Sequence, residues 1–369
     1  MEKTIKEIVL TGGPCSGKTT GRNYLAEKLR DRGFRVLLVP EVATMVISGG
    51  LDDLAKLIRS APHKYLETER QMLLLQMDLR KRFLKIAEPF IDEKPVIIYD
   101  RGPMDYKVYI KPEEFEAMIG EFNLSIYDVR DSFDGVIHLV TAANGAEKFY
   151  TLENNEARKE SSEEARLLDD STLNAWVGHQ HLRIIDNSTD FKQKMKRTLQ
   201  AICRFLGIPV PLEIERKFLL AKMPSLAIPE LKQAQEITIE QMYLESAPGQ
   251  EERIRKRAQY GFSVYYFTRK SPISSGIRSE REQEIRELEY IALQKRQIPG
   301  SRIIKKNRHC FVYNNQYFEL DIFIEPRGRC FLEIELTNRN DILSLPPFLE
   351  IEKEVTGDER YSNYALATS

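Results

Sequence analysis

Residues 12 to 19 of this chain are Gly12-Gly13-Pro14-Cys15-Ser16-Gly17-Lys18-Thr19. They follow the short apolar run 8–10, which predicts a strand, and they lead into residues 19–32, which predict a helix ending before Gly33. A Gly-x4-Gly-Lys-Thr stretch between a strand and a helix is the P-loop pattern, which is typical of nucleotide phosphate binding. A chance match in an ordinary strand–turn–helix is the alternative, and the flanking elements argue against it.

The residue types of this loop suit phosphate for physical reasons. Glycines let the backbone approach phosphate oxygens, and the start of the following helix carries a partial positive charge. Lys18 can reach the outer phosphates, and the Thr19 hydroxyl can hold Mg²⁺. The predicted nucleotide-binding residues of the loop are Gly12, Gly13, Pro14, Cys15, Ser16, Gly17, Lys18, Thr19 and Thr20.

Apolar runs and helical segments alternate through the first 206 residues. Further strands are predicted at 36–39, 96–99, 136–140 and 183–185, and further helices at 63–87 and 191–206. This alternation is typical of a parallel sheet with helices on both faces. We therefore expect an α/β nucleotide-binding domain over residues 1–207.

Two carboxylates follow predicted strands of this domain. Asp100 ends the run 96–99, where a carboxylate can order Mg²⁺ or accept a proton, and a turn cap is the simpler alternative. Small-molecule kinases of the P-loop class often carry Asp-Arg here, as in Asp100-Arg101. Such enzymes hold their acceptor near the position of Glu41, for which a solvated loop carboxylate is an equally good explanation.

Residues 146–176 are polar and basic, and they contain Arg158 and Arg166 among several glutamates. In P-loop kinases a mobile lid at this position brings arginines over the transferring phosphate. A solvated helix with ion pairs four residues apart explains the same composition. Both interpretations stay open, and Arg158 and Arg166 are candidate nucleotide-binding residues.

The first half resembles the AAA-type domain shared by the kinase half of the bacterial NAD-biosynthesis regulator NadR and by eukaryotic proteins of the TRPL-translocation-defect type. The matching residues are 11–20, Pro40-Glu41 and Asp100-Arg101-Gly102. The resemblance spans about residues 5–206 and implies ATP as the nucleotide. No Asn-Lys-x-Asp motif points to GTP, which stays an alternative.

The pattern changes after residues 207–211, Gly-Ile-Pro-Val-Pro, which predict a linker at 208–211. Charged and apolar residues then alternate with the period of strands in the runs 251–257, 262–270, 316–324 and 329–336. Only 285–297 and the extreme C-terminus look helical. We expect an α+β domain over residues 212–369 in which an antiparallel sheet closes on itself.

Charges share one face of several of these strands. Glu213, Glu215 and Lys217 do so because side chains alternate along a strand. The same spacing relates Arg253 to Arg255, Lys306 to Arg308 and Glu333 to Glu335, while Lys270 ends one strand and Asp321 lies within another. A half-exposed sheet is one explanation, and a barrel with a polar lumen is the other. Many such strands, of both signs, favour the barrel.

This half resembles the CYTH superfamily, the triphosphate tunnel metalloenzymes, over about residues 212–368. The matches in order are Glu213-x-Glu215-x-Lys217, Arg253-x-Arg255, Lys270, Glu282-x-Glu284, Lys306-x-Arg308, Asp321, Glu333-x-Glu335 and residues 353–358. Members of this superfamily include inorganic triphosphatases, thiamine triphosphatases and class IV adenylyl cyclases.

The resemblance implies roles for the matching residues. The polyphosphate would be bound by Lys217, Arg253, Arg255, Lys270, Lys306 and Arg308. Mg²⁺ or Mn²⁺ would be held by Glu213, Glu215, Glu282, Asp321, Glu333 and Glu335. Catalytic roles would belong to Glu213, Glu215 and Lys217 in the tunnel, and Asp100 would be the catalytic carboxylate of the first domain.

Composition limits the partners. The net charge of -1 argues against nucleic acid, so we expect nucleoside triphosphates and polyphosphate-type small molecules. Four cysteines without CxxC spacing fit a reducing compartment. No apolar run approaches the ~20 residues of a membrane span, and no signal peptide is evident, so we expect a cytoplasmic protein.

Two functions remain open from the sequence. The first is an enzyme that hydrolyses a triphosphate in the tunnel and binds and turns over ATP or GTP at the P-loop. The second is a nucleotide-switched regulatory protein whose tunnel binds a phosphorylated ligand such as a phosphoinositide. Many carboxylates in the tunnel favour hydrolysis, because a pure anion binder gains nothing from them.

Overall fold

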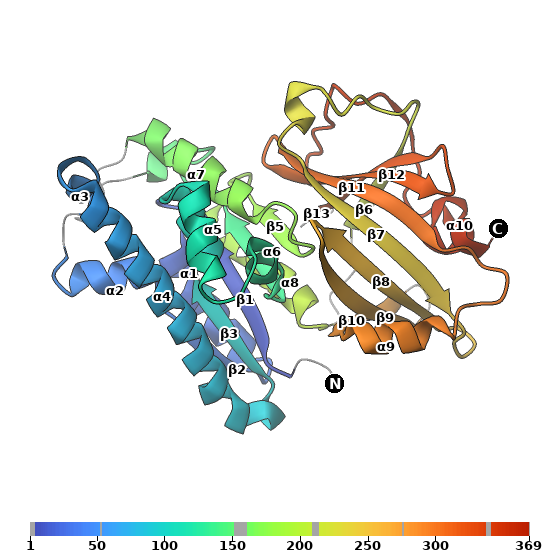
Figure 1. Cartoon of the computed structure of the whole chain (residues 1–369), viewed down its shortest axis with the longest axis horizontal. Coiled ribbons are helices and arrows are strands. Elements are labelled where there is room, and N and C mark those ends of the chain that lie inside the picture. Colours follow the sequence, from blue (N-terminus) through green and yellow to red (C-terminus); the bar gives the residue numbers. More distant parts are fainter. Residues whose placement is uncertain are drawn as a thin grey trace. The chain divides into compact units, whose positions relative to one another are not determined.

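The computed structural model describes residues 4–51, 54–150, 161–208, 214–274, 277–336 and 341–368. The chain divides into two compact units, Thr4–Phe205 and Leu206–Ser369, which are coloured blue to green and yellow to red in Figure 1. Each unit has a sheet of its own. We call them the N-terminal and the C-terminal unit.

The sheet of the N-terminal unit is parallel. In the described residues its strands are β1 (Lys6–Thr11), β2 (Arg35–Val39), β3 (Pro95–Asp100), β4 (Gly135–Leu139) and β5 (Leu182–Ile185). They lie in the order β2-β3-β1-β4-β5. Every residue of β3 and of β4 is buried, which requires cover on both faces of the sheet. The predicted α/β architecture is confirmed.

The helices of this unit are α1 (Lys18–Arg30), α2 (Val42–Ser48), α3 (Leu54–Ser60), α4 (Pro62–Ala87), α5 (Pro112–Gly120), α6 (Ile126–Asp131), α7 (Ser162–Trp176) and α8 (Phe191–Phe205). Among them, α1, α4 and α8 pack against strands of the sheet (Figure 1). Helices α1 and α8 contact each other, and Gly21 allows this because a Cβ there would lie 2.3 Å from the Met195 sulfur.

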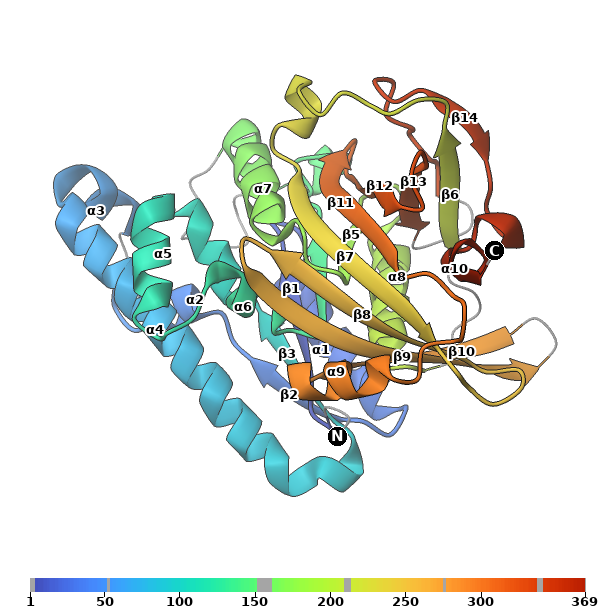
Figure 2. The same cartoon turned by 45° about the vertical axis from the view of Figure 1, so that its right-hand side comes forward.

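The C-terminal unit contains an antiparallel sheet. Within the described residues its strands are β6 (Ile214–Leu220), β7 (Gln235–Leu244), β8 (Glu251–Gln259), β9 (Phe262–Ser274), β10 (Ile277–Ile285), β11 (Ile304–Tyr313), β12 (Gln316–Glu325), β13 (Cys330–Leu336) and β14 (Ile351–Glu354). Their order is β10-β9-β8-β7-β11-β12-β13-β6-β14, so β10 and β14 lie at the edges. Figure 2 shows the curvature of this sheet.

Two helices complete the C-terminal unit, α9 (Glu287–Gln294) and α10 (Asn363–Thr368). Tyr290 of α9 packs in an apolar cluster with Met242 and Ile254 of the sheet, and Leu366 of α10 packs with Tyr243 and Phe331. The predicted antiparallel α+β architecture is confirmed. In the part of the chain that the structure describes, no helix is long and apolar enough to cross a membrane.

Candidate functional sites

The loop between β1 and α1 has the backbone that its glycines predict. Gly12 has a φ of 134°, and a Cβ there would lie 2.1 Å from the Leu139 carbonyl oxygen. Gly17 has a φ of 92° and Cys15 one of 55°, so the loop turns through the left-handed region twice before the helix begins. The sequence therefore folds locally into a tight turn at the N-terminus of α1, where a phosphate group could be bound.

Lys18 lies against this loop. Its Nζ donates to Gly12 O at 2.5 Å, to Gly13 O at 3.0 Å and to Ser16 Oγ at 3.0 Å. Burial, followed by the positive charge of Arg101, lowers the pKa of Lys18 to about 8. Thr19 and Thr20 lie in the first turn of α1 and are exposed, so their hydroxyls can reach a ligand.

The loop rests on the carboxyl end of β4. Thr141 Oγ1 donates to Pro14 O, and Ala142 N donates to Cys15 O at 3.2 Å. Buried Lys194 of α8 also donates to Ser16 O at 3.2 Å. Burial lowers the pKa of Lys194 to about 8. Sequence reasoning missed this support, because its residues lie far along the chain and match no short motif.

Asp100 lies at the carboxyl end of β3, as predicted, and is 2% exposed. Its Oδ2 accepts from Arg22 Nη1 at 3.3 Å, while its Oδ1 has no hydrogen-bond partner among the described residues. Burial raises the pKa of Asp100, although Lys18 opposes the rise. A buried oxygen without a partner is costly, so a ligand, a metal or a proton could be bound by this carboxylate at a gain in free energy.

Glu41 and Arg101 form an ion pair next to Asp100, with 2.5 Å between Arg101 Nε and Glu41 Oε1. Burial acts to raise the pKa of Glu41, but Arg101 and Lys18 outweigh it and lower that pKa to about 2. Arg101 Nη1 is buried and makes no hydrogen bond within the described ranges. The pair can therefore offer both a carboxylate and a free donor to a second substrate.

The predicted lid residues are only partly accounted for. Arg166 lies on α7, where its Nε donates to Ala143 O at 2.6 Å. Arg158 lies outside the described residues. The helical interpretation holds for residues 162–176, which form α7 with Ser161 as its N-cap.

Glu69 of α4 is a buried carboxyl that the sequence did not single out. It is 4% exposed, and burial raises its pKa to about 7, although a hydrogen bond with Tyr65 offsets part of the rise. Ionised Glu69 is therefore unfavourable in the folded state.

We expect this group to make the N-terminal unit lose stability as pH rises. Its folded pKa lies above the unfolded value of 4.5, so its stabilisation is complete below pH 4.5 and is lost as pH passes about 7. At ~1.4 kcal/mol for each pKa unit, the loss is roughly 3 kcal/mol. Glu69→Gln should remove this pH dependence in urea unfolding followed by Trp176 fluorescence. Exposed Glu67→Gln on the same helix should keep it, and two parallel profiles would contradict the prediction.

The second group of predicted residues gathers on one face of the antiparallel sheet. Residues directly opposite in adjacent strands share a face, as do residues two apart along a strand. The register pairs Glu215 with Glu335, Lys217 with Glu333, Arg308 with Asp321, and Arg253 with Thr268, which in turn pairs with Glu282. By this register the charged face contains Glu215, Lys217, Arg253, Arg255, Lys270, Glu282, Lys306, Arg308, Asp321, Glu333 and Glu335. Glu213 lies outside the described residues.

Much of the charged face is shielded from water. Lys306 is 2% exposed and Asp321 0%. Lys217 and Glu333 are each 8% exposed. A flat, half-exposed sheet would leave these charges in solvent, whereas here Leu366 of α10 packs against Tyr243 and Phe331 of the same face. The burial of these charges favours the predicted polar lumen over the alternative of charges facing water.

An ion network occupies one side of the charged face. Lys217 Nζ lies 2.8 Å from Glu333 Oε1, and Arg308 Nη2 lies 2.8 Å from Glu333 Oε2. Arg308 also binds Asp321 through Nε and Nη2, both at 2.7 Å, and contacts Glu319, while Lys306 contacts Asp321. Both Asp321 oxygens are thus engaged by cations.

β8 gives the charged face an excess of positive charge. Arg255 lies 3.7 Å from Glu282, and its Nε has no hydrogen-bond partner among the described residues. Burial and then neighbouring Arg253 lower the pKa of Arg255, with Arg308 and Arg257 adding to the effect. Several cations lie close together here and are shielded from water, so they repel one another. A polyanion such as a triphosphate would relieve this repulsion and stabilise the group.

Two carboxylates of the same face are candidates for holding a divalent cation. Glu215 and Glu335 lie directly opposite each other in β6 and β13. Carboxylate oxygens are the ligands that Mg²⁺ and Mn²⁺ prefer, so this pair could contribute to a metal site. The described residues contain no group of three or more carboxylate, histidine or cysteine ligands, so phosphate oxygens and water would complete such a site.

A family model described as an AAA domain matches residues 7–194. No curated protein matches. Among solved structures, the chain is similar to the inorganic triphosphatase NE1496, with 29% identity over 43% of this chain and 97% of that chain and a TM-score of 0.32. It is also similar to the PH1012 protein from Pyrococcus horikoshii OT3, with 27% identity over 35% of this chain and 80% of that chain and a TM-score of 0.25.

Proposed function

The chain belongs to the AAA domain family, and from that premise we propose an enzyme with two separate phosphate sites. The N-terminal unit binds ATP, or GTP, with Mg²⁺ at the loop 12–19 and turns it over. The C-terminal unit hydrolyses a triphosphate compound on its charged face, with Mg²⁺ or Mn²⁺. Inorganic tripolyphosphate, a nucleoside triphosphate and thiamine triphosphate are the candidate substrates.

The observation that carries the proposal is the composition of the charged face. Cations of both the ion network and β8 lie on the same face of the sheet as the opposed Glu215 and Glu335. A triphosphate needs cations for its oxygens and carboxylates for the metal that bridges them, and this face supplies both. A site for a simple anion would need only the cations.

Hydrolysis follows from positioning and charge. Arg255, Lys217 and Arg308 would hold the phosphate oxygens and stabilise the charge that builds up on them. Glu215 and Glu335 would hold the metal, which supplies charge neutralisation. Water attacks the terminal phosphorus, the bond from that phosphorus to the bridging oxygen breaks, and inorganic phosphate and the shortened phosphate chain leave. No covalent enzyme intermediate is needed.

The N-terminal unit is proposed to transfer or hydrolyse the terminal phosphate of its nucleotide. Lys18 would bind the phosphates and Thr19 would hold Mg²⁺, and Asp100, which interacts electrostatically with Lys18, has one unpartnered oxygen. That oxygen can accept the proton of an attacking water or hydroxyl, or a bond from a metal-bound water. The free donor of Arg101 supports a second substrate at the same place.

Phosphate release tests the proposal. Tripolyphosphate, ATP, GTP and thiamine triphosphate are each incubated with Mg²⁺ or Mn²⁺ and wild type, Lys18→Ala or Glu215→Ala. We expect tripolyphosphate hydrolysis to be lost only in Glu215→Ala, and nucleotide turnover at the N-terminal unit only in Lys18→Ala. Full tripolyphosphate hydrolysis in Glu215→Ala would contradict the tunnel assignment. No release from any substrate would favour the regulatory function, with phosphoinositide binding as the next measurement.

A further inference from the structure

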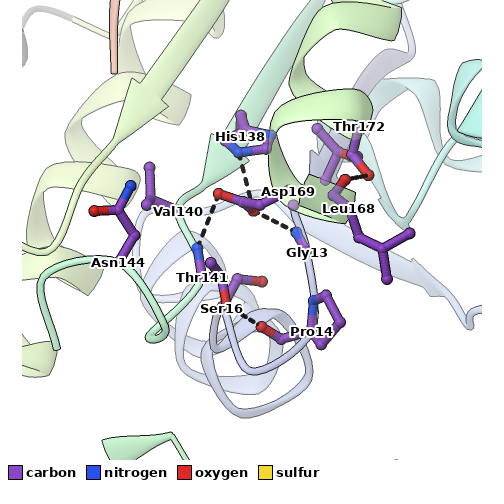
Figure 3. Close-up of polar contacts among 12 residues, drawn as sticks. Gly13, Pro14, Ser16, His138, Val140, Thr141, Asn144, Leu168, Asp169 and Thr172 are labelled. Carbon is purple, nitrogen blue, oxygen red and sulfur yellow. Dashed lines mark hydrogen bonds and ion pairs between the residues drawn. The ribbon is translucent and has the colours of Figure 1, made fainter. Parts of the chain in front are cut away.

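Asp169 lies in the middle of α7 and is 3% exposed. Its carboxylate points out of the helix toward the phosphate-binding loop (Figure 3). Oδ1 accepts from Gly13 N at 2.6 Å, and Oδ2 accepts from Thr141 N at 3.2 Å. His138 Nε2 lies 3.2 Å from Oδ1. One carboxylate thus joins the loop, the end of β4 and α7.

Close approach of this carboxylate requires Gly13. A Cβ at that position would lie 2.8 Å from Asp169 Oδ1 and 2.9 Å from Asp169 Cβ. A hydrogen bond of 2.6 Å to an ionised acceptor is among the strong ones. The second glycine of the loop therefore serves the contact with α7.

The same peptide unit also contacts Lys18. In the Gly12–Gly13 peptide, the N–H donates to Asp169 Oδ1 at 2.6 Å, and the C=O accepts from Lys18 Nζ at 2.5 Å. A trans peptide is planar, and its N–H and C=O point in opposite directions. Fixing the N–H therefore fixes the direction of the carbonyl, and a charged acceptor on the N–H also polarises the carbonyl toward its own donor.

We propose that Asp169 is a positioning residue of the nucleotide site, which orients the Gly12 carbonyl and through it holds Lys18 in place for phosphate. The inference rests on the proposed nucleotide site at the loop 12–19. Asp169 would thereby connect the position of α7 to the position of Lys18. Asp169 itself does not touch the nucleotide.

The chain offers a matched control for this residue. Asp170 is the next residue of the same helix and is exposed. Asp169→Asn and Asp170→Asn remove the same charge and change the side-chain volume equally. Asp169→Asn replaces one carboxylate oxygen by an amide, which cannot accept from both Gly13 N and Thr141 N.

The first test is equilibrium binding of MgATP to the full chain by calorimetry. Because a hydrogen bond to a charged group contributes substantially, Asp169→Asn should lower the affinity for MgATP roughly 10- to 100-fold. Asp170→Asn should leave that affinity unchanged. Tripolyphosphate hydrolysis, which belongs to the other unit, should be unchanged in both variants. Equal MgATP affinity in wild type and Asp169→Asn would overturn the inference.

A double-mutant cycle separates positioning from a general structural role. Lys18→Met is combined with Asp169→Asn, and we expect Asp169→Asn to add little once Lys18 is gone. Additive losses would mean that Asp169 acts on the fold and not through Lys18. If Lys18→Met does not lower the affinity for MgATP at all, the proposed nucleotide site itself is wrong.

Hydrogen exchange gives a readout that needs no nucleotide. The Gly13 amide should exchange faster in Asp169→Asn than in wild type, because its acceptor is weakened, and it should be unchanged in Asp170→Asn. The amides of α8 serve as the reference for global opening. Unchanged exchange at Gly13, or faster exchange throughout the N-terminal unit, would overturn the link.

Discussion

Lys18→Ala is expected to stop nucleotide turnover in the N-terminal unit, with a loss of at least about 10²–10³-fold, the scale seen when a group that stabilises transition-state charge is removed. Lys18 is the buried cation of the loop and touches Gly12 O, Gly13 O and Ser16 Oγ. No other lysine or arginine among the residues described contacts those three atoms. The measurement is steady-state phosphate release from ATP and GTP with Mg²⁺, made in the Glu215→Ala background because nucleoside triphosphates are candidate substrates of the C-terminal unit as well.

The control for this variant lies on the same helix. Lys28 of α1 is half-exposed and pairs with Glu27 and Asp31, so Lys28→Ala should keep full turnover. With Glu215 intact, tripolyphosphate hydrolysis should survive in both variants, because the charged face belongs to the other unit. Equal loss of both activities in Lys18→Ala would refute independent sites.

Local patterns predicted the two sheets. The apolar runs and the loop 12–19 identified β1 and α1 to within one or two residues, because a strand, a tight turn and a helix leave their signals in adjacent residues. The charged face of the C-terminal unit was predicted for a similar reason, because side chains alternate between the two faces of a strand and charges two residues apart therefore share a face. Their burial could not be predicted, because it depends on which distant parts of the chain, such as α10, pack on that face.

Distant contacts were not predictable. Asp169 lies 156 residues from Gly13, in a polar stretch whose composition suited a lid or a solvated helix equally well. Nothing in that stretch distinguishes Asp169 from exposed Asp170. Helices α2 and α3 have seven residues each, too few to show a helical period. Strand β7 was missed because Ile237 and Ile239 face the same side as Gln241, so its pattern of polar and apolar residues is mixed.

Arg308→Met should cost the C-terminal unit about 3–5 kcal/mol of unfolding free energy, the range for removing one partner of a buried ion pair. Arg308 contacts Asp321, Glu319 and Glu333, and these carboxylates would keep only the neighbouring lysines. Burial acts to raise the pKa of Glu333, but Lys217, Lys306 and Arg308 hold it well below its usual range. We expect tripolyphosphate hydrolysis to be lost as well.

Two features of the chain make this stability prediction measurable. The single tryptophan, Trp176, lies in the N-terminal unit, so its fluorescence should show an unchanged urea transition while hydrogen exchange in β11–β13 speeds up. Arg216 of β6 pairs with Glu354 and is half-exposed, so Arg216→Met should cost no more than ~1 kcal/mol. Equal costs for Arg308→Met and Arg216→Met would contradict a buried network, because an exposed pair is screened by water and a shielded one is not.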